Sequence, residues 1–222
     1  MPGQRTPTLV FDLDGTLLDV SARHHHVYSE LCTSLDGQPL DRATYWELKR
    51  QRTGWPEILA QSGIQPDLYN AFESEFQAQI ELPANLGFDV LFPASLGVLT
   101  KLAATHRLVL VSLRNSGTAL RAQLSVFALQ PFFEAIESAG DGGEPPFRVK
   151  ARLIRKTVAE GEPAVLIGDT EADVMAASSL GYPSIAVCSG IRDRDLLAQQ
   201  EPTYLVDGIG GVEDALRKGK LL

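Results

Sequence analysis

The sequence predicts an α/β protein in which a doubly wound parallel sheet carries an inserted helical subdomain. Short, continuous apolar runs of strand length recur along the chain, and segments with apolar residues at helical spacing separate them. Continuous apolar runs are typical of strands that are covered on both faces, as in a parallel sheet. Strands that alternate with helices favour parallel order, because each helix carries the chain back across the sheet.

Each predicted strand is a run of four or fewer apolar or small residues. The runs lie at 9–11, 108–111, 164–167 and 184–187, with a weaker candidate at 135–136. Helical spacing is seen in two apolar sets, Leu120, Leu124 and Phe127 after the candidate N-cap Ser116, and Leu153, Ile154 and Val158. A final short helix is expected after Asp207.

The segment 21–91 breaks this alternation. It is rich in Glu, Gln, Arg, Leu and aromatic residues, and its turn signals lie at Asp36-Gly37, Gly54, Gly63 and Pro66. We therefore expect a helical cap at 21–91 and an α/β core made of 1–20 and 92–222. Both crossings would lie near the first acidic turn, so that the cap covers the site and closes over it through hinges near Val20 and Leu91.

Composition excludes several classes of partner. A formal net charge of -8 and a pI near 5.0 disfavour binding to nucleic acid or to an anionic membrane. No apolar run approaches the roughly 18 residues of a membrane span, and the first apolar run is interrupted by carboxylates, so we expect a cytoplasmic protein. Cys32 and Cys188 are far apart and are interpreted as reduced thiols.

Two carboxylates follow the first apolar run directly, in Asp12-Leu13-Asp14-Gly15. Side chains two residues apart in a strand point to the same side, so a divalent cation would offset their repulsion. A calcium loop of the EF-hand type needs glycine at its sixth position and an acid at its twelfth, where this chain has Leu17 and Arg23. The pattern therefore favours another kind of metal-assisted site.

Three further signals occur later in the chain, two of them at the ends of predicted strands. Ser112 ends the run 108–111, Lys150 begins a helical pattern, and Asp169 and Asp173 follow the run 164–167. The carboxyl ends of the strands form the ligand crevice in a doubly wound sheet, so these side chains are expected to meet at one edge. The carboxylates among these groups offer oxygen, which favours Mg²⁺ over zinc for a metal bound there.

The order of these motifs resembles the haloacid dehalogenase superfamily, specifically its phosphoglycolate phosphatase-like branch, which has a Rossmann-like core and a helical C1-type cap. The resemblance extends over nearly the whole chain. It implies that Asp12 is a nucleophile that forms an aspartyl-phosphate, and that Asp14 is the general acid and later the base. Two carboxylates at one site titrate as a pair, which lets one stay ionised while the other holds a proton.

The resemblance also implies roles for the other groups. Ser112 would bind phosphate oxygens, and Lys150 would hold the nucleophile and offset phosphoryl charge. Asp169 and Asp173 would complete a Mg²⁺ site with Asp12 and Asp14. The chain departs from many relatives at Lys150, which precedes Ala rather than Pro, and at the Leu-Arg-Asn that follows Ser112. In that second departure, Arg114 either reaches a substrate anion or projects from the loop.

Two basic residues of the expected cap, Lys49 and Arg52, precede Gly54 in a stretch that resembles the specificity region of related caps. Substrate binding and a solvated helix end are both open for them. The consecutive residues His24, His25 and His26 cannot all converge from a helix, so we assign them no metal site.

The predicted function is therefore a Mg²⁺-dependent phosphatase acting on a small phosphorylated metabolite. Two alternatives remain, a phosphosugar mutase of the β-phosphoglucomutase kind and a catalytically silent phosphate-binding protein. Dehalogenase activity is disfavoured, because Asp14 stands where dehalogenases lack the acid. The sequence fixes neither the substrate nor the oligomeric state.

Overall fold

The structure is a computed structural model that describes residues 6–140 and 143–219. Residues 1–5, 141–142 and 220–222 of the expected core ranges lie outside the described residues. The chain divides into two compact units, one made of the residues up to Leu18 and from Leu91 onward, the other of residues 19–90. The sequence placed the corresponding boundaries after residues 20 and 91.

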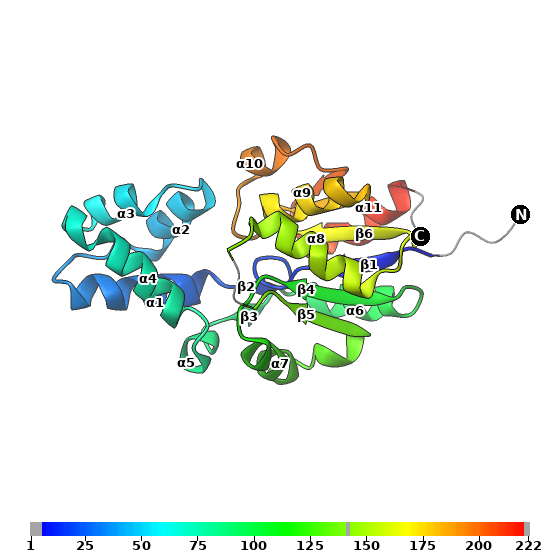
Figure 1. Cartoon of the computed structure of the whole chain (residues 1–222), viewed down its shortest axis with the longest axis horizontal. Helices are drawn as coiled ribbons and strands as arrows, with labels where there is room; N and C mark the ends of the chain where they lie inside the picture. The colour runs from blue at the N-terminus through cyan, green and yellow to red at the C-terminus, as the bar shows by residue number, and fades with distance from the viewer. Residues whose placement is uncertain (1–5, 141–142, 220–222) are drawn as a thin grey trace, which may run out of the picture. The chain divides into compact units, whose positions relative to one another are not determined.

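The first unit contains a six-stranded parallel sheet with the order β5-β4-β1-β6-β7-β8 (Figure 1). Its strands are β1 (Thr8–Phe11), β4 (Leu108–Ser112), β5 (Ala135–Ser138), β6 (Ala164–Gly168), β7 (Ser184–Val187) and β8 (Tyr204–Val206). Strand β1 lies between β4 and β6, with Val10 opposite Val109 on one side and Leu166 on the other. The first acidic turn therefore leaves the middle of the sheet.

Helices cover both faces of this sheet (Figure 1). They are α6 (Ser95–Ala103), α7 (Gly117–Val126), α8 (Pro146–Thr157), α9 (Glu171–Leu180), α10 (Arg194–Ala198) and α11 (Val212–Lys218), with 3-10 turns η2 (Gln130–Phe132) and η3 (Ile209–Gly211). Helices α8 and α9 pack on each other and on the sheet, and α6 packs against α11. This is the predicted doubly wound α/β fold.

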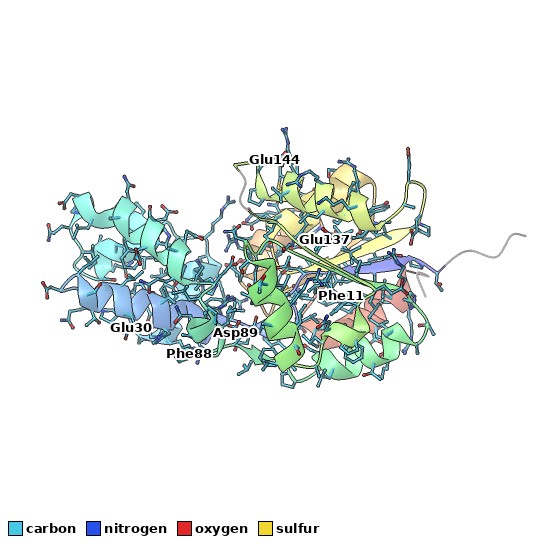
Figure 2. All side chains as sticks on the ribbon, turned by 60° about the horizontal axis from the view of Figure 1, so that its bottom comes forward. Phe11, Glu30, Phe88, Asp89, Glu137 and Glu144 are labelled. Carbon is cyan, nitrogen blue, oxygen red and sulfur yellow. The ribbon has the colours of Figure 1, made fainter. Side chains whose placement is uncertain are left out.

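Apolar side chains from the sheet and from α8 and α9 form one continuous core. Val10 and Val109 pack with Ile154 of α8 and Ala177 of α9. The next residue of β1, Phe11, which Figure 2 labels, is fully buried. Its ring makes an edge-to-face contact with that of Phe133, with ring centroids 6.3 Å apart. Burial on both faces explains why these strands have continuous apolar sequences.

The sheet has one strand that the sequence pattern did not predict. Strand β8 is three residues long, and it pairs only with β7 at the edge of the sheet. All three of its residues are partly exposed. Such a short edge strand lacks the apolar run that identified the central strands.

The second unit is helical. Its elements are α1 (Ser21–Ser34), α2 (Arg42–Arg50), α3 (Trp55–Gln61), η1 (Pro66–Leu68), α4 (Tyr69–Gln79) and α5 (Pro83–Leu86). Tyr28 and Tyr45 stack at a centroid distance of 4.3 Å inside its own apolar core, which also includes Phe72 and Phe76. None of the helices in 6–140 and 143–219 is both long and apolar enough to cross a membrane.

A buried ion pair joins the beginning and the end of the helical unit. Arg23 Nε of α1 lies 3.0 Å from Asp89 Oδ1, and both side chains are essentially inaccessible to solvent. Figure 2 labels Asp89 beside Phe88 on the segment that follows α5. The two crossings of the chain pair as a separate two-stranded sheet, β2 (Leu18–Asp19) with β3 (Val90–Leu91).

Candidate active site

Three neighbouring strands end at the candidate site. Asp12 follows β1, Ser112 is the last residue of β4, and Asp169 follows β6. Because β4, β1 and β6 are parallel and adjacent, their carboxyl ends lie at the same edge of the sheet. Residues separated by more than a hundred positions in the sequence are thereby brought together.

A buried lysine bridges two of the carboxylates. Lys150 of α8 donates to Asp12 Oδ1 at 2.7 Å and also donates to Asp173 Oδ1. Lys150 is one of the buried residues of α8, together with Val149 and Leu153. The other oxygen of Asp173 accepts from the backbone N–H of Thr170 at 3.1 Å, so Asp173 both holds Lys150 and caps α9.

Asp169 is fixed by two donors from other loops. Thr16 Oγ1 donates to Asp169 Oδ1 at 3.0 Å, and the backbone N–H of Ile191 donates to Oδ2 at 2.6 Å. Carboxylate oxygens of Asp12, Asp169 and Asp173 all lie within 4.8 Å of one another, and all three residues are buried. Such a cluster has the oxygen donors and the spacing that a hard divalent cation needs.

Three glycines make room for these carboxylates. A Cβ at Gly15, whose φ is +81°, would lie 2.0 Å from Asp169 Oδ2, and one at Gly190 would lie 2.2 Å from the same atom. A Cβ at Gly168 would lie 2.0 Å from the carboxyl carbon of Asp173. Any larger residue at these positions would push the acidic groups out of place.

Burial dominates the electrostatics of the cluster. Removal from water raises the pKa of Asp12 to about 7, although the ammonium of Lys150 acts in the opposite direction. Burial also raises the pKa of Asp169, with Asp12 and Asp173 adding repulsion. For Lys150, burial opposes the charged form, but the two carboxylates outweigh it and raise its pKa. A bound cation would relieve the repulsion that remains.

Asp14 is not part of this three-carboxylate cluster. Its two oxygens accept from Arg114, with Nε at 2.9 Å from Oδ2 and Nη2 at 2.5 Å from Oδ1. Ser112 is buried at the end of β4, and its Oγ accepts from the backbone N–H of Arg114 at 3.3 Å. The metal-binding role of the Asp14 side chain and substrate contact by Ser112 and Arg114 stay predictions.

Sequence reasoning assigned no role to Thr16, Gly190 or Ile191, which support Asp169. It also missed Gln123, whose Oε1 accepts from Arg114 Nη1. Thr16 stands inside the first acidic motif, where its position after Gly15 was a usable signal. The backbone N–H of Ile191 has no side-chain signal in the sequence. The only sign of a loop there is Gly190, which follows the apolar run 184–187.

Two of the basic residues predicted to bind substrate, Lys49 and Arg52, lie in the helical unit. Lys49 Nζ lies 5.4 Å from the ring centroids of both Trp55 and Phe76. Lys49, Arg52 and Trp55 help to line a pocket of about 380 Å³, which Glu73 also borders. The pocket combines cations with an aromatic face, and substrate contact there stays a prediction.

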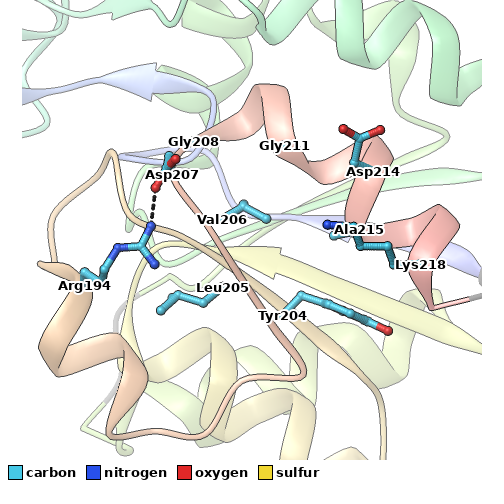
Figure 3. A pocket seen from close by; sticks show the side chains of 10 residues that line it. All are labelled: Arg194, Tyr204, Leu205, Val206, Asp207, Gly208, Gly211, Asp214, Ala215 and Lys218. Carbon is cyan, nitrogen blue, oxygen red and sulfur yellow. Dashed lines mark hydrogen bonds and ion pairs between the residues drawn. The ribbon is translucent and has the colours of Figure 1, made fainter.

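A second pocket, of about 440 Å³, lies beside the edge strand β8 (Figure 3). Arg194 and Asp207 form an ion pair on its wall, and Tyr204 and Lys218 also line it. None of the predicted site residues lines this pocket. Its ion pair is largely exposed and therefore screened by solvent, so we assign it no chemistry.

The fold and the carboxylate cluster together define an α/β protein with a buried site of oxygen donors at the carboxyl edge of a parallel sheet. Residues 6–181 match the family model of haloacid dehalogenase-like hydrolases. The chain belongs to this family.

Several named proteins align with most of the chain. A phosphoglycolate phosphatase of Synechococcus elongatus is 27% identical over 90% of this chain and 92% of its own length. A phosphoglycolate phosphatase of Caulobacter vibrioides is 30% identical over 82% and 79%, respectively. The pyrophosphatase PpaX of Bacillus velezensis is 25% identical over 93% and 94%.

Solved structures share the fold. A haloacid dehalogenase-like hydrolase of Streptococcus pneumoniae superposes with a TM-score of 0.75 at 21% identity, covering 96% of this chain and 99% of that one. A candidate β-phosphoglucomutase of Thermotoga maritima gives a TM-score of 0.66 at 17% identity, with coverage of 96% and 99%. The fold is therefore shared by proteins with different assigned reactions.

Proposed function

We propose that this protein is a Mg²⁺-dependent phosphatase that hydrolyses a small phosphorylated metabolite through an aspartyl-phosphate on Asp12. The observation that carries the proposal is the buried carboxylate of Asp12, paired with Lys150 and within 4.8 Å of carboxylate oxygens of Asp169 and Asp173. The relatives named phosphoglycolate phosphatase and pyrophosphatase support a phosphate ester or anhydride as the substrate class.

The donor set fits Mg²⁺. Asp12, Asp169 and Asp173 offer buried oxygens, and they would hold the ion together with groups of the substrate. Mg²⁺, when bound, supplies Lewis-acid polarisation of the phosphoryl group and screens it from the attacking carboxylate.

The chain's own residues supply the bond-making steps. A carboxylate oxygen of Asp12 attacks phosphorus, the bond from phosphorus to the leaving oxygen breaks, and Asp14 gives that oxygen a proton. In the second half, Asp14 takes a proton from a water whose oxygen attacks phosphorus, and the bond from phosphorus to Asp12 breaks. Free phosphate is released, and Lys150 offsets negative charge throughout.

A panel of phosphorylated metabolites, assayed with and without Mg²⁺, tests the proposal. We expect phosphate release that requires Mg²⁺ and is abolished in Asp12→Asn, while the circular dichroism spectrum of that variant is unchanged. Turnover that persists in Asp12→Asn would remove the assigned nucleophile. No release across the panel would favour a silent phosphate-binding protein.

The mutase alternative uses the same core and keeps the phosphoryl group for a second hydroxyl. Phosphorus NMR of the reaction with hexose phosphates separates the two. A phosphatase accumulates inorganic phosphate, whereas a mutase accumulates an isomeric sugar phosphate.

A further inference from the structure

Arg114 and Asp14 form a two-point ion pair at the edge of the site. The planes of guanidinium and carboxylate are matched, since Nε binds one oxygen and Nη2 binds the other. The Arg114 side chain is 3% exposed, and that of Asp14 is 20% exposed. A bidentate pair of this kind fixes the orientation of both groups, which a single point charge does not.

The guanidinium is itself held by the fold. Its Nη1 donates to Oε1 of Gln123, a buried residue of α7. The backbone of Arg114 is anchored on both sides, because its N–H donates to Ser112 Oγ at 3.3 Å and its carbonyl accepts from the N–H of Ala139 at 3.0 Å. Strands β4 and β5 and helix α7 therefore fix one position for the Arg114 side chain.

Asp14 differs from the other acids in what holds it. Asp12 and Asp173 bind the ammonium of Lys150, and Asp169 binds the donors of two loops. Asp14 follows β1 by three residues, and its partner Arg114 lies in the loop after β4, the neighbouring strand of the sheet. A group that transfers a proton must be held at a fixed place relative to the reacting oxygen, and small displacements cost large factors in rate.

We propose that Arg114 is a positioning residue, which fixes the carboxylate plane of Asp14 so that the second lone pair of one carboxylate oxygen takes up and gives back the proton exchanged with the reacting oxygens. Gln123 supports it by holding the opposite edge of the guanidinium. This role rests on the function proposed above. Arg114 would then act through Asp14 and not by direct contact with a substrate anion.

The test is a double-mutant cycle between Arg114→Lys and Asp14→Asn, measured as kcat/KM. Lysine keeps the charge and removes the planar fork, so it isolates positioning from electrostatics. Two substrates are compared, glycerol phosphate, whose alkoxide leaving group needs a proton, and p-nitrophenyl phosphate, whose phenolate leaves without one.

With glycerol phosphate we expect Arg114→Lys to lower kcat/KM by about tenfold to a hundredfold, mainly through kcat, because loss of a positioned acid has effects of this order or larger. With p-nitrophenyl phosphate the loss is several-fold smaller. In the Asp14→Asn background, Arg114→Lys has no further effect on glycerol phosphate. Gln123→Met gives a weaker version of the same pattern.

Arg107→Lys is the matched control. Arg107 precedes the same strand β4 at its other end and pairs with Glu134 and Glu162, so the variant removes an arginine–carboxylate pair far from the strand end that carries the site. It should leave kcat/KM unchanged for both substrates. Equal losses on both substrates in Arg114→Lys, or additive losses in the double variant, would overturn the positioning role.

A second readout is independent of turnover. The urea midpoints of the two single variants and the double variant should be coupled, because either change alone leaves a partner without its pair. Additive midpoint shifts would overturn the proposal. Failure of the proposed function has a different signature, namely phosphate release that survives Asp12→Asn while the coupled midpoints remain.

Discussion

Lys150 Nζ lies 2.7 Å from Asp12 Oδ1, and the exposed fractions of the two side chains are only 3% and 8%. Charges so deeply buried are tolerated only next to a charge of opposite sign, because that partner must offset the loss of hydration. The pair therefore contributes both to folding and to the proposed chemistry, because it holds the proposed nucleophile in place and puts a positive charge beside it.

Removing that ammonium is expected to cost both stability and activity. Lys150→Gln leaves Asp12 and Asp173 buried without their shared cation, and breaking a buried pair in this way costs about 3–5 kcal/mol. Urea unfolding at pH 8 without Mg²⁺ measures the loss. Lys156→Gln is the control, since Lys156 lies on the same helix, is about half exposed and pairs with Glu137 at 3.9 Å. Its unfolding free energy should change by less than about 1 kcal/mol.

Mg²⁺ is expected to stabilise the protein more at pH 8 than at pH 5. Burial raises the pKa of Asp12 from its ordinary value near 4 to about 7. The folded chain thus keeps a proton that the unfolded chain has released, so metal-free stability falls as pH rises from about 4 to about 7. Asp169 acts in the same direction. Above that window the ionised cluster binds Mg²⁺ without competition from protons.

Melting temperatures with and without Mg²⁺ at the two pH values check this. The change in the Mg²⁺-induced melting-temperature shift between pH 5 and pH 8 should be smaller in Asp12→Asn, because that variant lacks one of the titrating groups. A Mg²⁺ shift of the same size at pH 5 and pH 8 in the wild-type protein contradicts the assignment.

Gly190→Ala should displace Asp169 and weaken Mg²⁺ binding by tenfold or more, because the added methyl would lie 2.2 Å from Asp169 Oδ2. Isothermal titration with Mg²⁺ measures the affinity. Gly97→Ala is the control, since Gly97 lies in helix α6 with open space around the new methyl. That variant should bind Mg²⁺ normally and gain up to about 1 kcal/mol of stability. Equal Mg²⁺ affinities in both variants would argue against Asp169 as a ligand.

In the helical unit, Arg23→Met should lower the unfolding free energy by about 3–5 kcal/mol, because it leaves Asp89 charged and buried. Arg42→Met offers a comparison within the same unit. Arg42 lies 3.8 Å from Asp19 and is half exposed, so its loss should cost less than about 1 kcal/mol. Chemical denaturation followed by tryptophan fluorescence reports on this unit, since both tryptophans, Trp46 and Trp55, lie in it.

The sequence predicted the central part of the molecule because burial leaves a simple pattern there. The apolar runs around Val10, Val109 and Leu166 are strands covered on both faces, and the residues that follow them converge for topological reasons. The doubly wound fold class is confirmed. The edge strand at Tyr204 was missed, because partial exposure removes the continuous apolar signal.

Within the site, the order of the motifs and their resemblance to the haloacid dehalogenase superfamily selected Asp12, Lys150, Asp169 and Asp173, which the structure brings together. The supporting contacts could not be predicted in this way. A backbone N–H such as that of Ile191 has the same chemistry in every residue but proline, so nothing in the sequence marks it as a donor to Asp169. The partner of Arg114 was equally hidden, because an arginine after a strand fits a substrate anion as well as a neighbouring carboxylate.

The pairing of Leu18–Asp19 with Val90–Leu91 makes the helical segment a removable cassette. Its two ends leave and rejoin the chain on one narrow ribbon, and no strand of the six-stranded sheet lies between them in the sequence. Such a segment can be lengthened, shortened or exchanged without the loss of any hydrogen bond between strands of the six-stranded sheet. Diversity can thus accumulate in one part of the gene while the acidic framework is inherited unchanged.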